Sequence, residues 1–145
     1  QAISISPNSG VFNVNTPYTF TTVVSDPDGF QDIKYCRLLI NTSVNGKNCP
    51  YLYYNLNNNK LYLRDDANTS WLGGFNPGSS KVIENSYVKL DCRNTAKSTS
   101  GDNLTVNWKI TFKTPFKGSK KSYLIVYDDS NAKSGWKEVG TVTVR

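Results

Sequence analysis

Several residue types on which enzyme chemistry commonly depends are absent or scarce in this 145-residue sequence. There is no histidine, so the commonest general base and metal ligand is missing. Glutamate occurs twice, as Glu84 and Glu138, and neither a Gly-x-Ser-x-Gly motif nor a glycine-rich phosphate loop is present. A cysteine nucleophile would have no histidine to activate it. These absences predict a protein that is not an enzyme.

The chain also lacks methionine and any run of about 18 apolar residues, the length that a membrane-spanning helix requires. It starts at Gln1 without a charged and then apolar signal segment, which predicts a chain processed or excised from a longer one, with any signal peptide removed. We expect no membrane insertion. A length of 145 residues fits a single domain, 1–145, with a core of its own.

Good helix formers are scarce as well, because alanine and glutamate are few while asparagine, serine, threonine, tyrosine and valine are common. Segments of period-two alternation or β-branched and aromatic composition predict strands. They cover residues 2–6, 11–14, 18–25, 33–41, 51–56, 60–64, 81–92, 104–114, 122–128 and 139–144. Residues 65–80 read as a long loop and 94–102 as a turn. The pattern predicts an all-β fold, an immunoglobulin-like antiparallel β-sandwich of about eight or nine strands with an extra hairpin at 51–64.

Three of these strands have a clear inward face. The apolar positions predicted to point inward are Cys36, Leu38 and Ile40 in the first, Val82, Val88, Leu90 and Cys92 in the second, and Leu104, Val106, Trp108, Ile110 and Phe112 in the third. Trp108 is assigned to the core because it lies between apolar alternates. The same phase would point Glu84 inward, which is unusual for a carboxylate.

Three short segments resemble parts of known bacterial domains: SPNSG at 6–10, SDPDG at 25–29 and VGTVTV at 139–144. Over most of its length the chain thereby resembles immunoglobulin-like domains, cadherin-like or fibronectin-type-III-like, of secreted bacterial surface proteins. The resemblance implies a secreted, cell-surface module that occurs in tandem and acts as a spacer, adhesin or fibre part, with neighbouring domains or subunits as partners. Some such sandwiches bury a carboxylate that drives a Lys–Asn isopeptide bond, a role that would fall to Glu84.

Two acidic turns are candidates for a calcium site. Asp26 and Asp28 lie in the turn after the strand at 18–25, and Asp128 and Asp129 begin the turn before the last strand. In an immunoglobulin-like sandwich these turns lie at the same end, where their carboxylates could supply some of the six to eight oxygens that Ca²⁺ requires. Cadherin-like relatives use similar loops for calcium. The alternative is that each aspartate caps its own turn.

Aromatic residues are concentrated around the extra hairpin and the loop that follows it. Tyr53, Tyr54, Tyr62 and Trp71 are candidates for binding a sugar, because flat rings beside polar side chains suit the apolar face and polar rim of a sugar ring. The alternative is ordinary packing. Adjacent residues of a strand point to opposite faces, so Tyr53 and Tyr54 cannot both point inward.

The three cysteines allow one disulfide with one thiol left over. Cys36 and Cys92 are both expected to face inward, and a bridge between them could contribute ~3–4 kcal/mol. Cys49 is the alternative partner of Cys92. The sequence favours Cys36–Cys92 slightly and does not exclude the other pairing.

The formal net charge is +6, with lysines concentrated late in the chain. They are Lys109, Lys113, Lys117, Lys120 and Lys121. Because arginine and interleaved aromatic residues are missing from this run, we expect solvated lysines and no nucleic-acid partner. Taken together, the sequence predicts a non-catalytic structural or adhesive module of a surface protein or extracellular fibre, with Ca²⁺ as a possible ligand. The alternative is a carbohydrate-binding module whose partner is a glycan.

Overall fold

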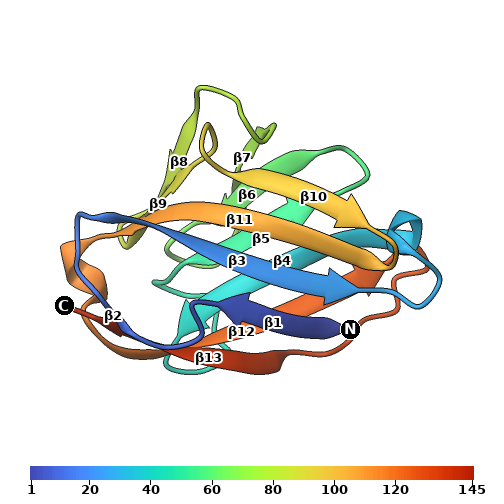
Figure 1. Cartoon of the computed structure of the whole chain (residues 1–145). Helices are drawn as coiled ribbons and strands as arrows, with labels where there is room; N and C mark the ends of the chain where they lie inside the picture. Colours follow the sequence, from blue (N-terminus) through green and yellow to red (C-terminus); the bar gives the residue numbers. More distant parts are fainter.

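The computed structural model describes residues 1–145 and contains thirteen strands in two sheets that pack face to face (Figure 1). The strands are β1 (Ala2–Ser6), β2 (Val11–Phe12), β3 (Pro17–Ser25), β4 (Ile33–Asn41), β5 (Tyr51–Asn55), β6 (Lys60–Arg64), β7 (Trp71–Phe75), β8 (Val82–Glu84), β9 (Val88–Asp91), β10 (Ala96–Ser100), β11 (Asn103–Phe112), β12 (Gly118–Asp128) and β13 (Lys137–Val144). Two 3-10 turns, Phe30–Asp32 and Thr114–Phe116, are the helical segments. Neither approaches the length and apolarity of a helix that crosses a bilayer.

The order of the strands is that of an immunoglobulin-like sandwich. Sheet A has the order β1-β3-β11-β9-β8, with β10 also paired to β11, and sheet B has the order β2-β13-β12-β4-β5-β6-β7. The first sheet corresponds to strands A, B, E and D of an immunoglobulin domain, and the second to G, F and C with the extra C′ and C″ strands of the variable type. All pairs are antiparallel except β2 with β13. The predicted fold class is confirmed, with more strands than the eight or nine expected.

The core lies between the two sheets and follows the period-two pattern of the sequence. β11 alternates along its whole length, and its inward residues are at most 1% exposed. Trp108 is fully buried, as predicted, and its Nε1–H donates to Oγ1 of the buried Thr22 at 2.9 Å. The one polar group of this large side chain is therefore satisfied inside the core.

The predicted strand at 81–92 is instead the hairpin of β8 and β9. The side chain of Asn85 forms its turn, because Oδ1 accepts the backbone N–H groups of Tyr87 and Val88 at 2.8 and 3.0 Å. The interruption changes the phase, so Val82 is 53% exposed rather than inward. Glu84 is also exposed and forms a 2.8 Å ion pair with Lys113, which removes the buried carboxylate that an isopeptide site would need. The inward orientations predicted for Val82 and Glu84 were therefore wrong, whereas Val88, Leu90 and Cys92 are buried as predicted.

The region predicted as a loop at 65–80 contains β7, the outer strand of sheet B. Its two central glycines have positive φ, +101° at Gly73 and +93° at Gly74, which other residues rarely adopt. The pairing with β6 shifts register at this point. The resulting bulge turns Trp71 to the outer face of the sheet and leaves Phe75 packed against the core. The predicted turn at 94–102 likewise contains a strand, β10.

Candidate functional site

The two predicted acidic turns do lie at the same end of the sandwich. Carboxylate oxygens of Asp26, Asp32 and Asp128 all lie within 4.8 Å of one another. Two of the four predicted residues, Asp26 and Asp128, are therefore brought together, and the third member of the cluster is Asp32, which was not predicted. The sequence offered little sign of Asp32, because it belongs to a short 3-10 turn at the start of β4.

The other two predicted ligands, Asp28 and Asp129, are exposed and lie outside this cluster. The backbone N–H of Asp28 donates to Oδ1 of Asp26 at 2.8 Å, which is the cap of an Asx turn. Oδ1 of Asp129 accepts a 2.9 Å hydrogen bond from the side-chain amide of Asn57. Asp26 thus caps its own turn. Oδ1 of Asp128 caps the other turn by accepting the backbone N–H groups of Ser130 and Ala132 at 2.9 and 2.8 Å, so the turn-capping alternative describes these two residues.

The electrostatics of the three clustered carboxylates differ from one residue to the next. Partial burial raises the pKa of Asp32, and the neighbouring carboxylates, Asp26 first, raise it further. The pKa of Asp128 is lowered, chiefly by the Ser130 hydroxyl that donates to Oδ1 at 2.7 Å. The cluster repels a further negative charge and would gain from a cation. The calcium site stays a prediction.

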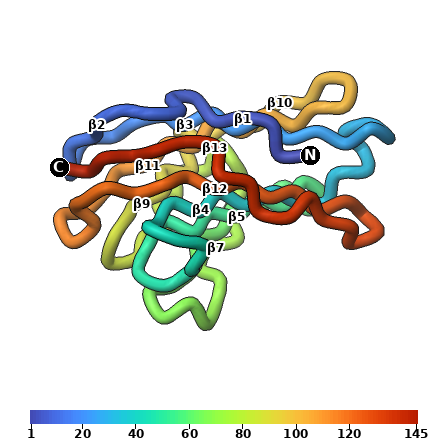
Figure 2. Tube along the Cα trace, turned by 90° about the horizontal axis from the view of Figure 1, so that it is seen from below, coloured from blue at the N-terminus to red at the C-terminus, as the bar shows by residue number.

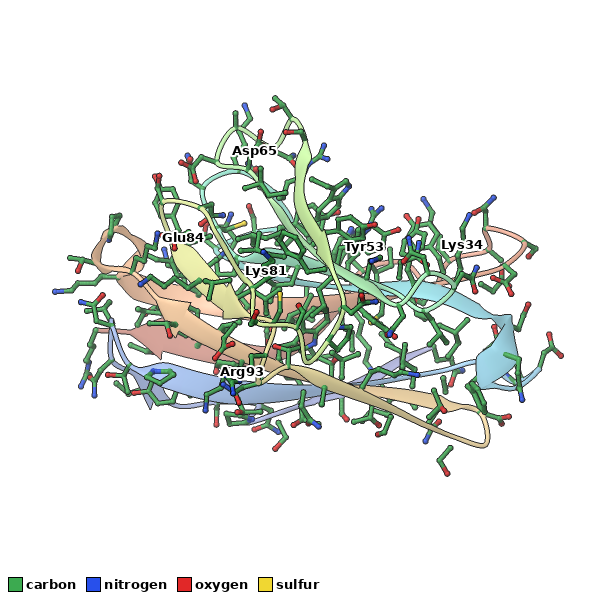
Figure 3. The ribbon with its side chains drawn as sticks, turned by 90° about the horizontal axis from the view of Figure 1, so that it is seen from above. Lys34, Tyr53, Asp65, Lys81, Glu84 and Arg93 are labelled. Carbon is green, nitrogen blue, oxygen red and sulfur yellow. The ribbon has the colours of Figure 1, made fainter.

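A second candidate site covers the outer face of sheet B. Half-buried aromatic side chains from successive strands meet there because they occupy the outward positions of the period-two pattern. We call this set the aromatic face; it consists of Tyr35, Tyr51, Tyr53, Tyr62, Trp71, Tyr127 and Trp136. Figure 3 labels Tyr53 near the middle of the sheet and Lys34 beside the turn that follows β12.

The rings of the aromatic face form a continuous row of contacts. Tyr127 stacks on Tyr35 with centroids 4.5 Å apart, and Tyr35 meets Tyr53 edge to face at 4.9 Å. Tyr53 in turn stacks on Tyr62 at 4.9 Å and contacts Trp71 at 4.9 Å. Neighbouring rings at these separations attract one another, so each side chain is held in place by the next.

Three of the four predicted sugar-binding residues, Tyr53, Tyr62 and Trp71, lie on this face. Tyr54 does not: it is fully buried on the opposite side of β5, where its hydroxyl donates to Asn59 at 2.6 Å. That assignment was wrong, because Tyr54 has the phase of the buried Leu52. Sequence reasoning also missed Tyr35, whose outward phase in the strand at 33–41 was a usable signal.

Arg37 lies within the aromatic face. Its guanidinium carbon is 4.7 Å from the ring centroid of Tyr35, 5.0 Å from that of Tyr53 and 5.1 Å from that of Trp71. The rings of Tyr51 and Tyr127 lie at 6.0 and 5.5 Å. Such contacts between a cation and the faces of aromatic rings are attractive. The positive charge of Arg37 therefore lies in the middle of the aromatic face.

The phenol groups of Tyr35 and Tyr53 remain neutral at physiological pH. Burial raises the pKa of Tyr35 and of Tyr53 above the ordinary value of 10.0, although the charge of Arg37 acts in the opposite direction. The side-chain amide of Asn55 donates to the Tyr53 oxygen at 2.9 Å, and that of Asn58 to the Tyr62 oxygen at 3.3 Å. Each of these two hydroxyls accepts a hydrogen bond and retains a hydrogen to donate.

The predicted disulfide is not formed, and Cys36, Cys49 and Cys92 are free, buried thiols. The inward orientation expected for Cys36 and Cys92 is correct, since both are fully buried. Inward orientation alone does not bring two Cα atoms to the separation of about 4.4–6.8 Å that a bridge requires. Neither predicted pairing, Cys36–Cys92 or Cys49–Cys92, is formed in this structure.

Comparison with known proteins adds little to these observations. No protein-family model matches the chain, and no curated protein sequence matches it. Among solved structures, the chain is similar to BcpA, the major pilin subunit of Bacillus cereus, with 10% identity and a TM-score of 0.36. The match covers 97% of this chain and 38% of the pilin chain. A likeness at this level carries no argument about function.

Proposed function

We propose that the chain is a non-catalytic adhesive module of a secreted or cell-surface protein, and that its aromatic face binds carbohydrate. The observation that carries the proposal is the row of seven half-buried rings across β12, β4, β5, β6, β7 and the segment before β13. A contiguous apolar surface on a soluble protein commonly marks a binding site. Sugars suit such a surface because their rings have apolar faces and hydroxyl rims.

The polar groups around the rings fit the same ligand class. The free hydroxyl hydrogens of Tyr53 and Tyr62 and the neighbouring amides of Asn55 and Asn58 lie at the edges of the stacked pair. They offer hydrogen bonds to the hydroxyl groups of a sugar stacked beside them. Because the rings project from paired strands, little conformational freedom would be lost on binding.

Trp71→Ala in a glycan array tests the proposal. The wild-type chain should bind a defined set of glycans, and the variant should bind them at least tenfold more weakly, a loss of about 1.4 kcal/mol. Tyr87→Ala is the matched control, because Tyr87 is a half-buried aromatic residue in the β8–β9 turn, outside the face. Absence of glycan binding by the wild type, or equal binding by both variants, would contradict the proposal.

A second candidate role is spacing between neighbouring domains or subunits of a surface assembly. The two termini lie on opposite sides of the sandwich in both views of the chain trace (Figure 1 and Figure 2), an arrangement suited to end-to-end linkage. The two roles are compatible, since the aromatic face lies on a sheet surface rather than at a terminus. Sedimentation analysis tests this role: concentration-dependent self-association or binding to a neighbouring domain would support it, and a monomer without affinity for its neighbours would oppose it.

A further inference from the structure

Arg37 has almost none of the hydrogen bonds that a guanidinium normally makes. Of its five N–H donors, one is paired: Nη1 donates to the Tyr51 hydroxyl oxygen at 3.3 Å, a long bond. Its Nε is buried and has no partner, and Nη2 donates to no atom of the protein. A buried donor without an acceptor is unfavourable. A ligand on the face would meet the Nη groups rather than the buried Nε, and Nη2 is the unpaired donor that it can reach.

No carboxylate compensates the positive charge of Arg37. The ion pairs of the chain are Lys113 with Glu84 and Lys121 with Glu138, and Arg37 belongs to neither. Its neighbours on the paired strands are Ile125 on β12 and Tyr53 on β5, which supply no anion. Cation–π contacts with neutral rings attract the charge but accept no hydrogen bonds in the plane of the guanidinium.

Arg64 shows how an arginine of the same sheet is satisfied internally. Its guanidinium carbon lies 5.0 Å from the Trp71 ring, much as that of Arg37 does. In addition, Nε donates to the Asn68 side chain at 2.8 Å and Nη2 to the Asn68 backbone carbonyl at 3.2 Å. Trp71 is thus flanked by one arginine with internal acceptors and one nearly without them. The unmet donors of Arg37 are a property of its site rather than of the residue type.

We propose that Arg37 is an anion site within the aromatic face, and that the glycan bound there is acidic, with a carboxylate carried on the sugar ring. The inference rests on the proposed carbohydrate binding and specifies its ligand. A planar guanidinium binds a carboxylate through two parallel N–H···O bonds, a geometry that an ammonium group cannot reproduce. In a uronic or sialic acid the carboxyl carbon is bonded directly to the ring. The anion and the stacked ring are then adjacent, as Arg37 is to Tyr53 and Trp71.

An array of paired glycans tests this inference. Each acidic glycan stands beside a neutral counterpart: sialyllactose beside lactose, and a galacturonic acid oligomer beside its methyl ester, with sulfated lactose as a third type of probe. We expect the wild type to bind at least one carboxylate member about tenfold or more tightly than its neutral partner. Arg37→Gln should reduce that preference to about twofold or less, whereas Lys97→Gln, the same change of charge on exposed β10, should preserve it.

Two further measurements keep the test decisive if Arg37→Gln fails to fold. Arg37→Lys retains the charge but not the fork, so it should retain less than half of the carboxylate preference. Raising the salt concentration from about 0.05 to about 0.5 M should weaken acidic binding and leave neutral binding unchanged, because salt screens only the charge interaction.

The outcomes separate this inference from the proposed function. Equal binding of acidic and neutral partners, lost in Trp71→Ala, would overturn the role of Arg37 and leave carbohydrate binding intact. Binding of sulfated lactose without binding of any carboxylate glycan would also overturn it. Failure of the wild type to bind any glycan would overturn both.

Discussion

The three cysteine thiols should be inert toward thiol reagents while the protein is folded. Cys36 and Cys92 are fully buried and Cys49 is 1% exposed. Burial raises the pKa of Cys36 and of Cys49 to about 12 and that of Cys92 to about 11, from an ordinary value of 9.0. Because the thiolate is the reactive form, burial and pKa act in the same direction.

The pKa shifts alone give a large effect. At pH 8 a thiol of pKa 9.0 is about 9% ionised, a thiol of pKa 11 about 0.1%, and a thiol of pKa 12 about 0.01%. The thiolate population therefore falls about a thousandfold for Cys36 and Cys49 and about a hundredfold for Cys92. The reagent is also excluded from the core, so a buried thiol can react only after local or global unfolding of the protein.

Spectrophotometric titration with DTNB at pH 8 measures this directly. The folded protein should show no rapidly reacting thiol, and the same protein in concentrated guanidinium chloride should show three. A fast-reacting thiol in the folded state would refute the burial argument. One thiol after denaturation, in a protein two hydrogens lighter by intact mass, would show that a disulfide does form and that Cys36–Cys92 or Cys49–Cys92 must be reconsidered.

Two further predictions concern the glycine bulge and the acidic cluster. Gly73→Ala should lower the free energy of unfolding, measured by urea titration, by about 2–4 kcal/mol, because φ is +101° and a Cβ would lie 2.3 Å from Cδ1 of Ile83. Gly78→Ala is the control: Gly78 also has a positive φ but has open space around it, so this substitution should cost less. Equal losses in the two variants would contradict the close packing at Gly73. Asp32→Asn should raise the melting temperature at pH 7 in the presence of chelator and much less near pH 3.5, because a raised folded-state pKa means that stability is lost as pH rises through it. Millimolar Ca²⁺ should raise the melting temperature of the wild type more than that of Asp32→Asn, and the absence of any shift with Ca²⁺ would end the calcium prediction.

The strands that could be predicted are those with one buried face. Buried and exposed residues alternate in β4 and β11 because one side of each strand packs in the core, and the sequence shows this as alternating apolar and polar residues. β10 has the sequence AKSTS and no buried residue, so it is held by backbone pairing to β11 and carries no hydrophobic signal. β7 was missed because its glycines break the period at the bulge. Backbone pairing and glycine geometry, rather than side-chain pattern, define these two strands.

The candidate sites were predictable where topology or local clustering determined them. Asp26 and Asp128 meet because an immunoglobulin-like fold places their turns at one end. Tyr53, Tyr62 and Trp71 are close in sequence and remain close in space. Tyr127, by contrast, reaches the aromatic face because it pairs with Tyr35 across β12 and β4, a register that no local pattern reveals. Long-range pairing of strands cannot be read from the local pattern of residues along the chain.

Packing explains part of the aromatic face but leaves one feature unexplained. Ile125 points to the outer side of sheet B and is 2% exposed, so the overlying side chains shield an apolar residue outside the main core. A leucine or methionine in place of Arg37 would serve that purpose without placing an unpaired charge and a buried, unsatisfied Nε among aromatic rings. The stem of an arginine can cover apolar surface, yet its head is normally solvated or paired. The packed rings therefore hold one another in place, and the unpaired Nη2 of Arg37 points to a ligand that supplies the acceptor.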